Sequence, residues 1–104
     1  MTADTLARLA ATIQKRLGAD PDTSWTASLL ARGPEACARK FAEEATEAVI
    51  EAVKGDAARL TCEAADVLYH LLVMCAARGV TLEAIEAELA RREGRSGIAE
   101  KASR

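Results

Sequence analysis

The chain has 104 residues and a mass of 11.0 kDa, a length that fits one compact domain and leaves no room for two. Its 14 Lys and Arg residues stand against 16 Asp and Glu residues, so it lacks the basic surface expected of a nucleic-acid-binding protein. Half of the residues are apolar, but only 3% are aromatic, and alanine is abundant, which favours helices over sheets. We therefore expect an all-α domain whose small core is completed by a second copy of the chain.

The sequence also indicates a cytoplasmic protein. Its longest apolar run, residues 71–77, falls far short of the roughly 20 residues that cross a bilayer. The first residues carry neither the basic nor the apolar segment of a secretory signal. The three cysteines, Cys37, Cys62 and Cys75, form no CxxC pair and fit buried, reduced thiols. We expect no membrane helix and no disulfide.

Apolar residues at spacings of three and four predict helices at residues 5–17, 25–31, 34–54, 57–78 and 81–93. Pro34 suits the first turn of the third helix, where backbone N–H groups have no partner within the helix. Gly55 suits its left-handed end, and Asp56 can cap the next helix. Such a short connection predicts an antiparallel hairpin. We expect the helices at 5–17 and 81–93 to flank it in a four-helix-bundle-like core that dimerisation completes. We expect residues 1–94 to form the domain and 95–104 a basic tail, mobile unless a ligand or partner holds it.

Acidic residues lie beside the apolar stripe of both hairpin helices. In the helix at 34–54 the expected buried face consists of Phe41, Ala45, Ala48, Val49 and Ala52. One flank of that face is lined by Lys40, Glu44, Glu47 and Glu51, whereas Glu43 points farther away. In the following helix the corresponding flank carries Glu63, Asp66 and His70, beside a stripe of Leu60, Val67, Leu71 and Met74.

Four carboxylates converge if these two flanks face the same side, namely those of Glu44, Glu47, Glu63 and Asp66. Such a cluster repels itself without a cation, and an all-oxygen set suits Mg²⁺ or Mn²⁺ better than Zn²⁺. The plainer interpretation is a solvated acidic face, in which Lys40 and Glu44 form a simple ion pair one turn apart.

The acidic spacing, Glu43-Glu44-x-x-Glu47 followed by Glu63-x-x-Asp66, resembles the signature of the MazG-like all-α nucleoside triphosphate pyrophosphohydrolases. More of the chain is similar to one branch of that superfamily, the phosphoribosyl-ATP pyrophosphohydrolases. The similar segments are residues 24–30, 40–50, 63–73 and 96–104. Two positions depart from that family's pattern: Trp25 stands where Tyr is frequent, and Ala42 where Gly often precedes the glutamate pair.

The resemblance implies a homodimeric enzyme that hydrolyses phosphoribosyl-ATP to phosphoribosyl-AMP and pyrophosphate with Mg²⁺, the second step of histidine biosynthesis; Mn²⁺ is an alternative ion. Within it, Glu44, Glu47, Glu63 and Asp66 are the expected metal ligands. Glu43, or another carboxylate outside the ligand set, is a candidate for orienting the attacking water, although it faces outward on a helical wheel.

Cations are expected near a triphosphate ester. Lys40 lies one turn from Glu44, and Lys101 and Arg104 of the tail are candidates to close over the phosphates. Trp25 either stacks on the base or packs in the domain. His70 is a candidate to support the metal ligands without binding the ion.

Two rival functions are a housecleaning hydrolase of other nucleotides, which would keep the carboxylates without needing this tail, and a catalytically silent helical dimerisation module. Residues Cys37, Cys62 and Cys75 contain no Cys/His zinc cluster between them, so the chain is not expected to carry out the following cyclohydrolase step.

Overall fold

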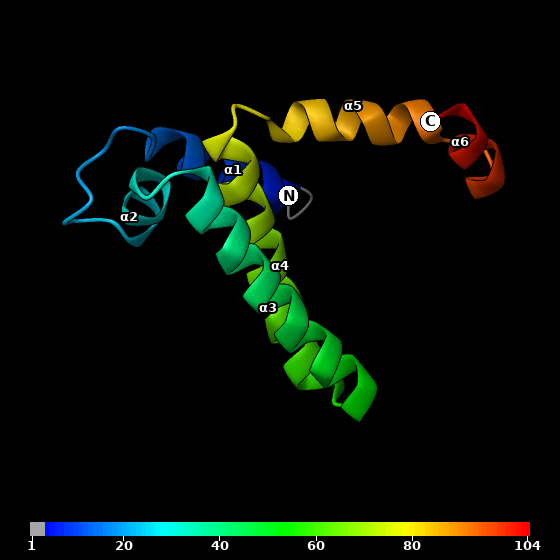
Figure 1. Ribbon diagram of the computed structural model, residues 1–104, viewed down its shortest axis with the longest axis horizontal. Helices are drawn as coiled ribbons and strands as arrows, with labels where there is room; N and C mark the ends of the chain where they lie inside the picture. Colours follow the sequence, from blue (N-terminus) through cyan, green and yellow to red (C-terminus); the bar gives the residue numbers. More distant parts are fainter. Residues whose placement is uncertain (1–3) are drawn as a thin grey trace.

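The computed structural model describes residues 4–104, and within that range every regular element is a helix (Figure 1). The helices are α1 (Thr5–Lys15), α2 (Trp25–Ala31), α3 (Pro34–Lys54), α4 (Ala57–Ala77), α5 (Leu82–Arg92) and α6 (Gly97–Ser103). The all-α class and the first five helices are confirmed, with α1 ending two residues earlier than expected.

The α3–α4 hairpin forms because its connection is short and its two helix ends are well capped. Gly55 ends α3 with a φ of 81°, a left-handed conformation that glycine adopts without steric cost, and its N–H donates to the carbonyl of Glu51. The Asp56 carboxylate then accepts from the Arg59 N–H at 3.0 Å and caps α4. Both caps agree with the sequence, and the two helices run antiparallel over their whole length (Figure 1).

The core lies at the end of the hairpin opposite Gly55, where α1 and α2 pack against α4. Its buried members are Ile13, Leu29, Cys37, Leu72, Val73, Ala76 and Leu82. Two polar contacts connect the elements around it. The Cys37 thiol donates to the Leu29 carbonyl at 3.2 Å, and the hydroxyls of Thr26 and Tyr69 share a hydrogen bond. These contacts hold one end of the hairpin rigid while the other end projects from the core.

Helix α5 does not flank the hairpin, contrary to the expected four-helix arrangement. Leu82, its first residue, joins the core, but the rest of α5 extends away from α3 and α4 (Figure 1). We call α5 and α6 together the arm. The radius of gyration is 15.5 Å. A compact domain of this length would have about 13 Å. The chain is therefore more open than a closed bundle.

The predicted buried face of α3 is partly wrong. Val49 is 61% exposed and Ala52 is also exposed, whereas Phe41, Ala45 and Ala48 are half-buried. The buried residues are Cys37, Glu44 and Glu51, which recur at intervals of seven along the helix. Because α3 packs mainly against α4, we infer that α4 covers this stripe, whereas the more apolar stripe is covered only in part.

The expected burial of the cysteines needs correction. Cys62 is exposed and Cys75 half-buried, so of the three free thiols Cys37 alone is fully buried. Within the predicted tail, residues 97–103 form α6, which is capped by the Ser96 hydroxyl accepting from the Ala99 N–H. Trp25 is 54% exposed with the Arg32 guanidinium 5.4 Å from its ring, which rules out packing in the core.

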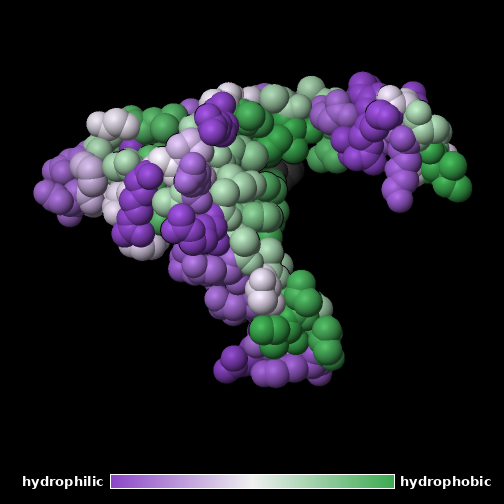
Figure 2. Space-filling view, viewed as in Figure 1, coloured by the Kyte–Doolittle hydropathy of each residue, from purple (hydrophilic) through white to green (hydrophobic). Residues whose placement is uncertain are grey.

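Apolar side chains gather on the side of the hairpin that faces the arm and on the underside of the arm itself (Figure 2). Val49, Val53, Leu68 and Leu89 are among the large apolar residues left exposed. In the angle between α1, α4 and α5 lies an apolar cavity of about 240 Å³, lined by residues that include Leu68, Leu71 and Leu89. A second chain would remove this surface from water.

Among the described residues, α4 alone is long and apolar enough to cross a membrane. The core helix of a small bundle meets the same two criteria, so this finding carries little weight. In addition, α4 carries Glu63, Asp66 and His70 in its middle, and ionisable groups at that depth of a bilayer are costly.

Candidate metal and nucleotide site

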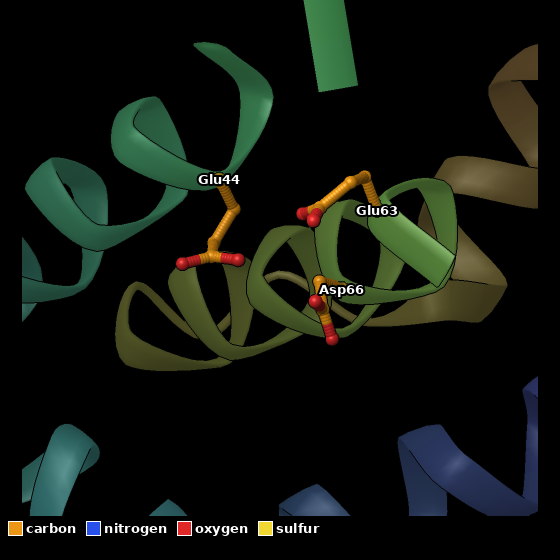
Figure 3. A group of neighbouring side chains, drawn as sticks. All are labelled: Glu44, Glu63 and Asp66. Carbon is orange, nitrogen blue, oxygen red and sulfur yellow. The ribbon is translucent and has the colours of Figure 1, made fainter. Parts of the chain in front are cut away.

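The hairpin brings carboxylates of its two helices together. Glu44 extends from α3 toward α4, where Glu63 and Asp66 lie one turn apart (Figure 3). One carboxylate oxygen from each of these three side chains lies within 4.8 Å of the other two. The predicted convergence of the two acidic flanks is therefore seen for Glu44, Glu63 and Asp66.

Among the described residues, Lys40 is the cation that pairs with this cluster, and one positive charge does not balance three carboxylates. Glu44 is only 9% exposed, and its ion pair is with Lys40, whose Nζ lies 3.5 Å from Oε2. Oε1 of Glu63 is buried without a hydrogen-bond partner. Burial raises the pKa of the Glu63 carboxyl, and the charges of Glu47, Asp66, Glu44 and Glu51 raise the same pKa further. Ionised together, these side chains need a positive charge from outside the chain.

The donor atoms of the cluster indicate which cation fits. All are carboxylate oxygens from two rigid helices, and hard divalent cations such as Mg²⁺ prefer oxygen ligands. The unpartnered Glu63 oxygen also points to a bound cation, because a buried acceptor without a donor is costly unless a ligand satisfies it. The residues present therefore fit a magnesium or manganese ion.

Glu47 and Glu43 lie outside the three-residue group. Glu47 is exposed, yet among the neighbouring charges it has the largest effect on the raised pKa of Glu63, so it lies at the rim of the cluster. The Glu43 side chain is exposed and lies 3.6 Å from the Lys40 ammonium. That position agrees with the outward direction expected from the helical wheel.

His70 is buried and lies one turn beyond Asp66 on α4. Burial lowers the pKa of its imidazole, an effect opposed by the nearby Glu44 charge, which favours the protonated form. The ring contacts Tyr69 edge-on, with centroids 4.8 Å apart, and Tyr69 is in turn hydrogen-bonded to Thr26 of α2. Helix α2 is thus joined to α4 at Tyr69, next to His70, a connection between distant segments that helical periodicity does not reveal.

The burial of Glu51 is not predicted by the sequence. The acidic pattern places Glu51 on the same flank as Glu44 and Glu47, a further turn along α3. In the structure it is 7% exposed, and its Oε1 has no hydrogen-bond partner. The sevenfold spacing of Cys37, Glu44 and Glu51 is the signal that predicts this burial once α4 is known to be the neighbouring helix.

The expected phosphate-binding cations are not gathered around the cluster in one chain. Lys40 is adjacent to it, but Lys101 and Arg104 lie at the end of α6, well away from the middle of the hairpin (Figure 1). Glu100 of α6 is buried among arginines, with Oε2 at 2.7 Å from Arg91 Nη2. Trp25 is accessible for stacking at the start of α2.

Comparison with known proteins gives a consistent answer. The sequence pattern of the family described as phosphoribosyl-ATP pyrophosphohydrolase matches residues 6–93. A phosphoribosyl-ATP pyrophosphatase of Cereibacter sphaeroides is 75% identical over 95% of this chain and 96% of its own length. Proteins of the same name from Dinoroseobacter shibae and Paracoccus denitrificans are 75% and 74% identical, over 97% and 92% of their lengths. The resemblance seen in the acidic motif and the tail is confirmed, and the chain belongs to the phosphoribosyl-ATP pyrophosphohydrolase family.

Proposed function

We propose that this chain hydrolyses phosphoribosyl-ATP to phosphoribosyl-AMP and pyrophosphate, the second step of histidine biosynthesis, in the cytoplasm. The observation that carries the proposal is the convergence of Glu44, Glu63 and Asp66, with ligand atoms within 4.8 Å of one another, in a chain of this family. Mg²⁺ is the proposed ion, with Mn²⁺ as an alternative, and Glu47 completes the ligand set from the rim.

When bound, the ion would stabilise negative charge on the phosphate oxygens and lower the pKa of a bound water. The side chains around the ion would balance the phosphate charge, orient the water and support the ligands. Lys40 is close enough to Glu44 to balance phosphate charge as well. Glu43, held beside Lys40, is proposed to orient the attacking water. His70, whose pKa the charges of Glu44 and Asp66 raise against the effect of burial, is proposed to support these ligands without binding the ion.

Substrate specificity is proposed to come from residues outside the cluster. Trp25 offers an exposed ring on which the base could stack. The Arg32 guanidinium lies over this ring, in the position that a stacked purine would occupy. Lys101 and Arg104 are proposed to contact phosphate. Because α6 lies away from the cluster of its own chain, these two side chains would serve the site of a partner subunit (Figure 1).

A homodimer is proposed because one chain exposes too much apolar surface. The accessible surface is 7106 Å². A compact monomer of this mass would expose about 5,600 Å², and the difference, about 1,500 Å², lies in the range buried per subunit in obligate dimers. The exposed apolar side of the hairpin and the underside of α5 are the proposed interface (Figure 2).

The test is pyrophosphate release from phosphoribosyl-ATP, ATP and dUTP by the purified protein with Mg²⁺. We expect release from phosphoribosyl-ATP and a rate lowered roughly 10²–10³-fold by Glu44→Gln or Glu47→Gln, the loss typical of removing one stabilising group of a polar site. Faster hydrolysis of ATP or dUTP would favour a housecleaning enzyme instead. Unchanged turnover in both variants would refute the metal site.

A further inference from the structure

We propose that three arginines at the far end of the arm bind a phosphate group, and that Glu100 of α6 occupies their site in the free chain. The arginines are Arg91, Arg92 and Arg95. They lie well away from the acidic cluster of the same chain (Figure 1). The proposal rests on the proposed function, because its ligand is a phosphate of the substrate or the pyrophosphate product. It concerns binding without a metal ion, so it can be tested apart from hydrolysis.

The far end of the arm is positively charged, although the chain as a whole is not. Residues 91–104 contain five Lys and Arg residues against two Glu residues, a net charge of +3. Since the whole chain carries −2, residues 1–90 carry −5. Hydrophilic side chains gather at this end of the arm (Figure 2). An anion is therefore attracted to this end of the molecule more than to the remaining, acidic surface.

Three guanidinium groups meet here at one carboxylate. Oε2 of Glu100 lies 2.7 Å from Arg91 Nη2 and 3.6 Å from Arg92 Nε. Its other oxygen, Oε1, lies 3.6 Å from Arg95 Nε. Glu100 is 6% exposed, whereas the three arginine side chains are 40–47% exposed. Guanidinium groups match the oxygens of phosphate in pairs, so a position surrounded by arginines is suited to a phosphate group.

The carboxylate of Glu100 satisfies this position only in part. Oε2 accepts a hydrogen bond from Arg91, but the buried Oε1 has no hydrogen-bond partner. The distance of 3.6 Å between Oε1 and Arg95 Nε is too long for a hydrogen bond. A terminal phosphate group carries three acceptor oxygens and more negative charge than a carboxylate. It can therefore accept from all three arginines, which Glu100 does not do.

The carboxylates near these arginines do not balance their charge. Glu88 of α5 accepts from Arg91 at 2.7 Å and from Arg92 at 2.8 Å. These hydrogen bonds lower the pKa of Glu88 to about 2, so Glu88 is ionised at neutral pH. Glu88 and Glu100 together supply two negative charges for three positive ones. When a phosphate replaces Glu100, Glu88 still fixes two of the guanidinium groups, and the site is preorganised.

Helix α6 is attached in a way that allows Glu100 to leave. Glu100 is the buried residue of this helix, whereas Ile98, its large apolar residue, is 84% exposed. The chain turns between α5 and α6 at Gly94, whose φ of 78° glycine adopts without steric cost. Ion pairs with half-exposed arginines contribute little to stability. A phosphate group therefore displaces α6 without disturbing the apolar core.

The experiment is a calorimetric titration of the full-length protein with inorganic pyrophosphate, in EDTA and at low ionic strength. We expect one pyrophosphate per chain. Arg95→Gln should weaken binding about tenfold or more, since hydrogen bonds between charged groups contribute that factor. Glu100→Gln should strengthen binding several-fold, because it removes the charge that competes with the ligand. Hydrogen–deuterium exchange in residues 97–103 of the wild type should become faster when pyrophosphate is added.

Arg59→Gln is the matched control, because it removes an arginine that pairs with carboxylates elsewhere in the chain, those of Glu51 and Asp56. It should bind pyrophosphate as tightly as the wild type. The proposal is overturned if Arg95→Gln binds as tightly as Arg59→Gln, which would indicate attraction to the net charge alone. It is also overturned if Glu100→Gln binds more weakly than the wild type, since Glu100 would then support the site and not occupy it.

Hydrolysis kinetics identify the source of the phosphate. A KM for phosphoribosyl-ATP raised about tenfold in Arg95→Gln would assign the site to the substrate. A change confined to inhibition by pyrophosphate would assign it to the product, and either result supports the site. A protein that binds pyrophosphate as expected but hydrolyses no phosphoribosyl-ATP refutes the proposed function alone. Normal hydrolysis, with equal pyrophosphate binding by Arg95→Gln and Arg59→Gln, refutes this site alone.

Discussion

At the scale of single residues, the acidic site depends on which face of α3 contacts α4. The convergence of Glu44, Glu63 and Asp66 could be predicted from the sequence, since residues one helical turn apart share a face and a tight turn places two helices side by side. The burial of Glu51 could not be predicted in this way. Helical wheels place the most apolar stripe inward, but the stripe of α3 that meets α4 contains carboxylates, while Val49 faces outward.

Glu63 should destabilise the protein when no divalent ion is present. Burial and the adjacent carboxylates raise its pKa, so its ionised form is disfavoured in the folded state. A carboxyl with a raised folded pKa lowers the free energy of unfolding above that pKa, and the loss disappears as the pH falls toward the ordinary value of 4.5. In EDTA at neutral pH, Glu63→Gln should therefore melt a few degrees higher than the wild type, as measured by circular dichroism.

The pH dependence and a control make this prediction specific. The difference in Tm should shrink as the pH approaches 4.5, the ordinary pKa of this carboxyl. With Mg²⁺ present, the wild type should gain stability and the variant should gain less, since an ion that binds the folded state raises the midpoint. Glu43→Gln, which alters an exposed carboxylate, should melt like the wild type. A lower Tm for Glu63→Gln in EDTA would contradict the assignment.

At the scale of elements, helix boundaries were predictable and the tail was not. Gly55, Asp56 and Thr81 act through local backbone geometry, so their effects can be read from the sequence. Helix α6 depends on contacts that periodicity does not encode. Arg91 and Arg92 of α5, together with Arg95, surround the buried Glu100 carboxylate. This ion network folds the tail back onto the end of α5.

Glu100 should hold α6 in place. Glu100→Gln keeps the size of the side chain but removes the charge that faces three arginines. Hydrogen–deuterium exchange should then become faster in residues 97–103 and stay unchanged in α3 and α4, since α6 lies at the far end of α5 from the hairpin (Figure 1). Equal exchange rates in the tail of both proteins would show that the network does not order it.

Removal of residues 95–104 tests the proposed role of the tail in substrate binding. The deletion takes away Lys101 and Arg104 without touching the carboxylate cluster. We expect a KM for phosphoribosyl-ATP that is raised roughly tenfold or more, because charge-assisted hydrogen bonds to phosphate contribute about 1.5–3 kcal/mol each. Mn²⁺ binding should be unchanged. A KM equal to that of the full chain would argue against phosphate contact.

At the scale of the whole molecule, one chain leaves much apolar surface exposed. Helix α5 is attached to the core mainly through Leu82, and the apolar cavity beneath it is open to solvent at Leu89, which is 58% exposed. The composition predicted this shortage of core, since a small alanine-rich domain buries little apolar surface. It could not predict which helix would separate from the bundle.

The mass of the protein in solution should be about 22 kDa, twice that of the 11.0 kDa chain. Size-exclusion chromatography with light scattering measures it directly. Leu89→Glu should shift the mass toward that of one chain, because burying an unpaired carboxylate in an apolar interface is costly. Glu83→Gln, on an exposed position of the same helix, should leave the mass unchanged. A wild-type mass of one chain would refute the dimer.

The brief Gly55–Asp56 connection also sets the order in which the protein assembles. Contacts across α3 and α4 join positions near each other in the sequence, and closing so short a loop costs little entropy. In the proposed dimer, the exposed apolar side of α5 is covered only when a second chain binds. After dilution from denaturant, helical ellipticity should therefore return at a rate independent of protein concentration, whereas catalytic activity should recover by a slower, bimolecular phase.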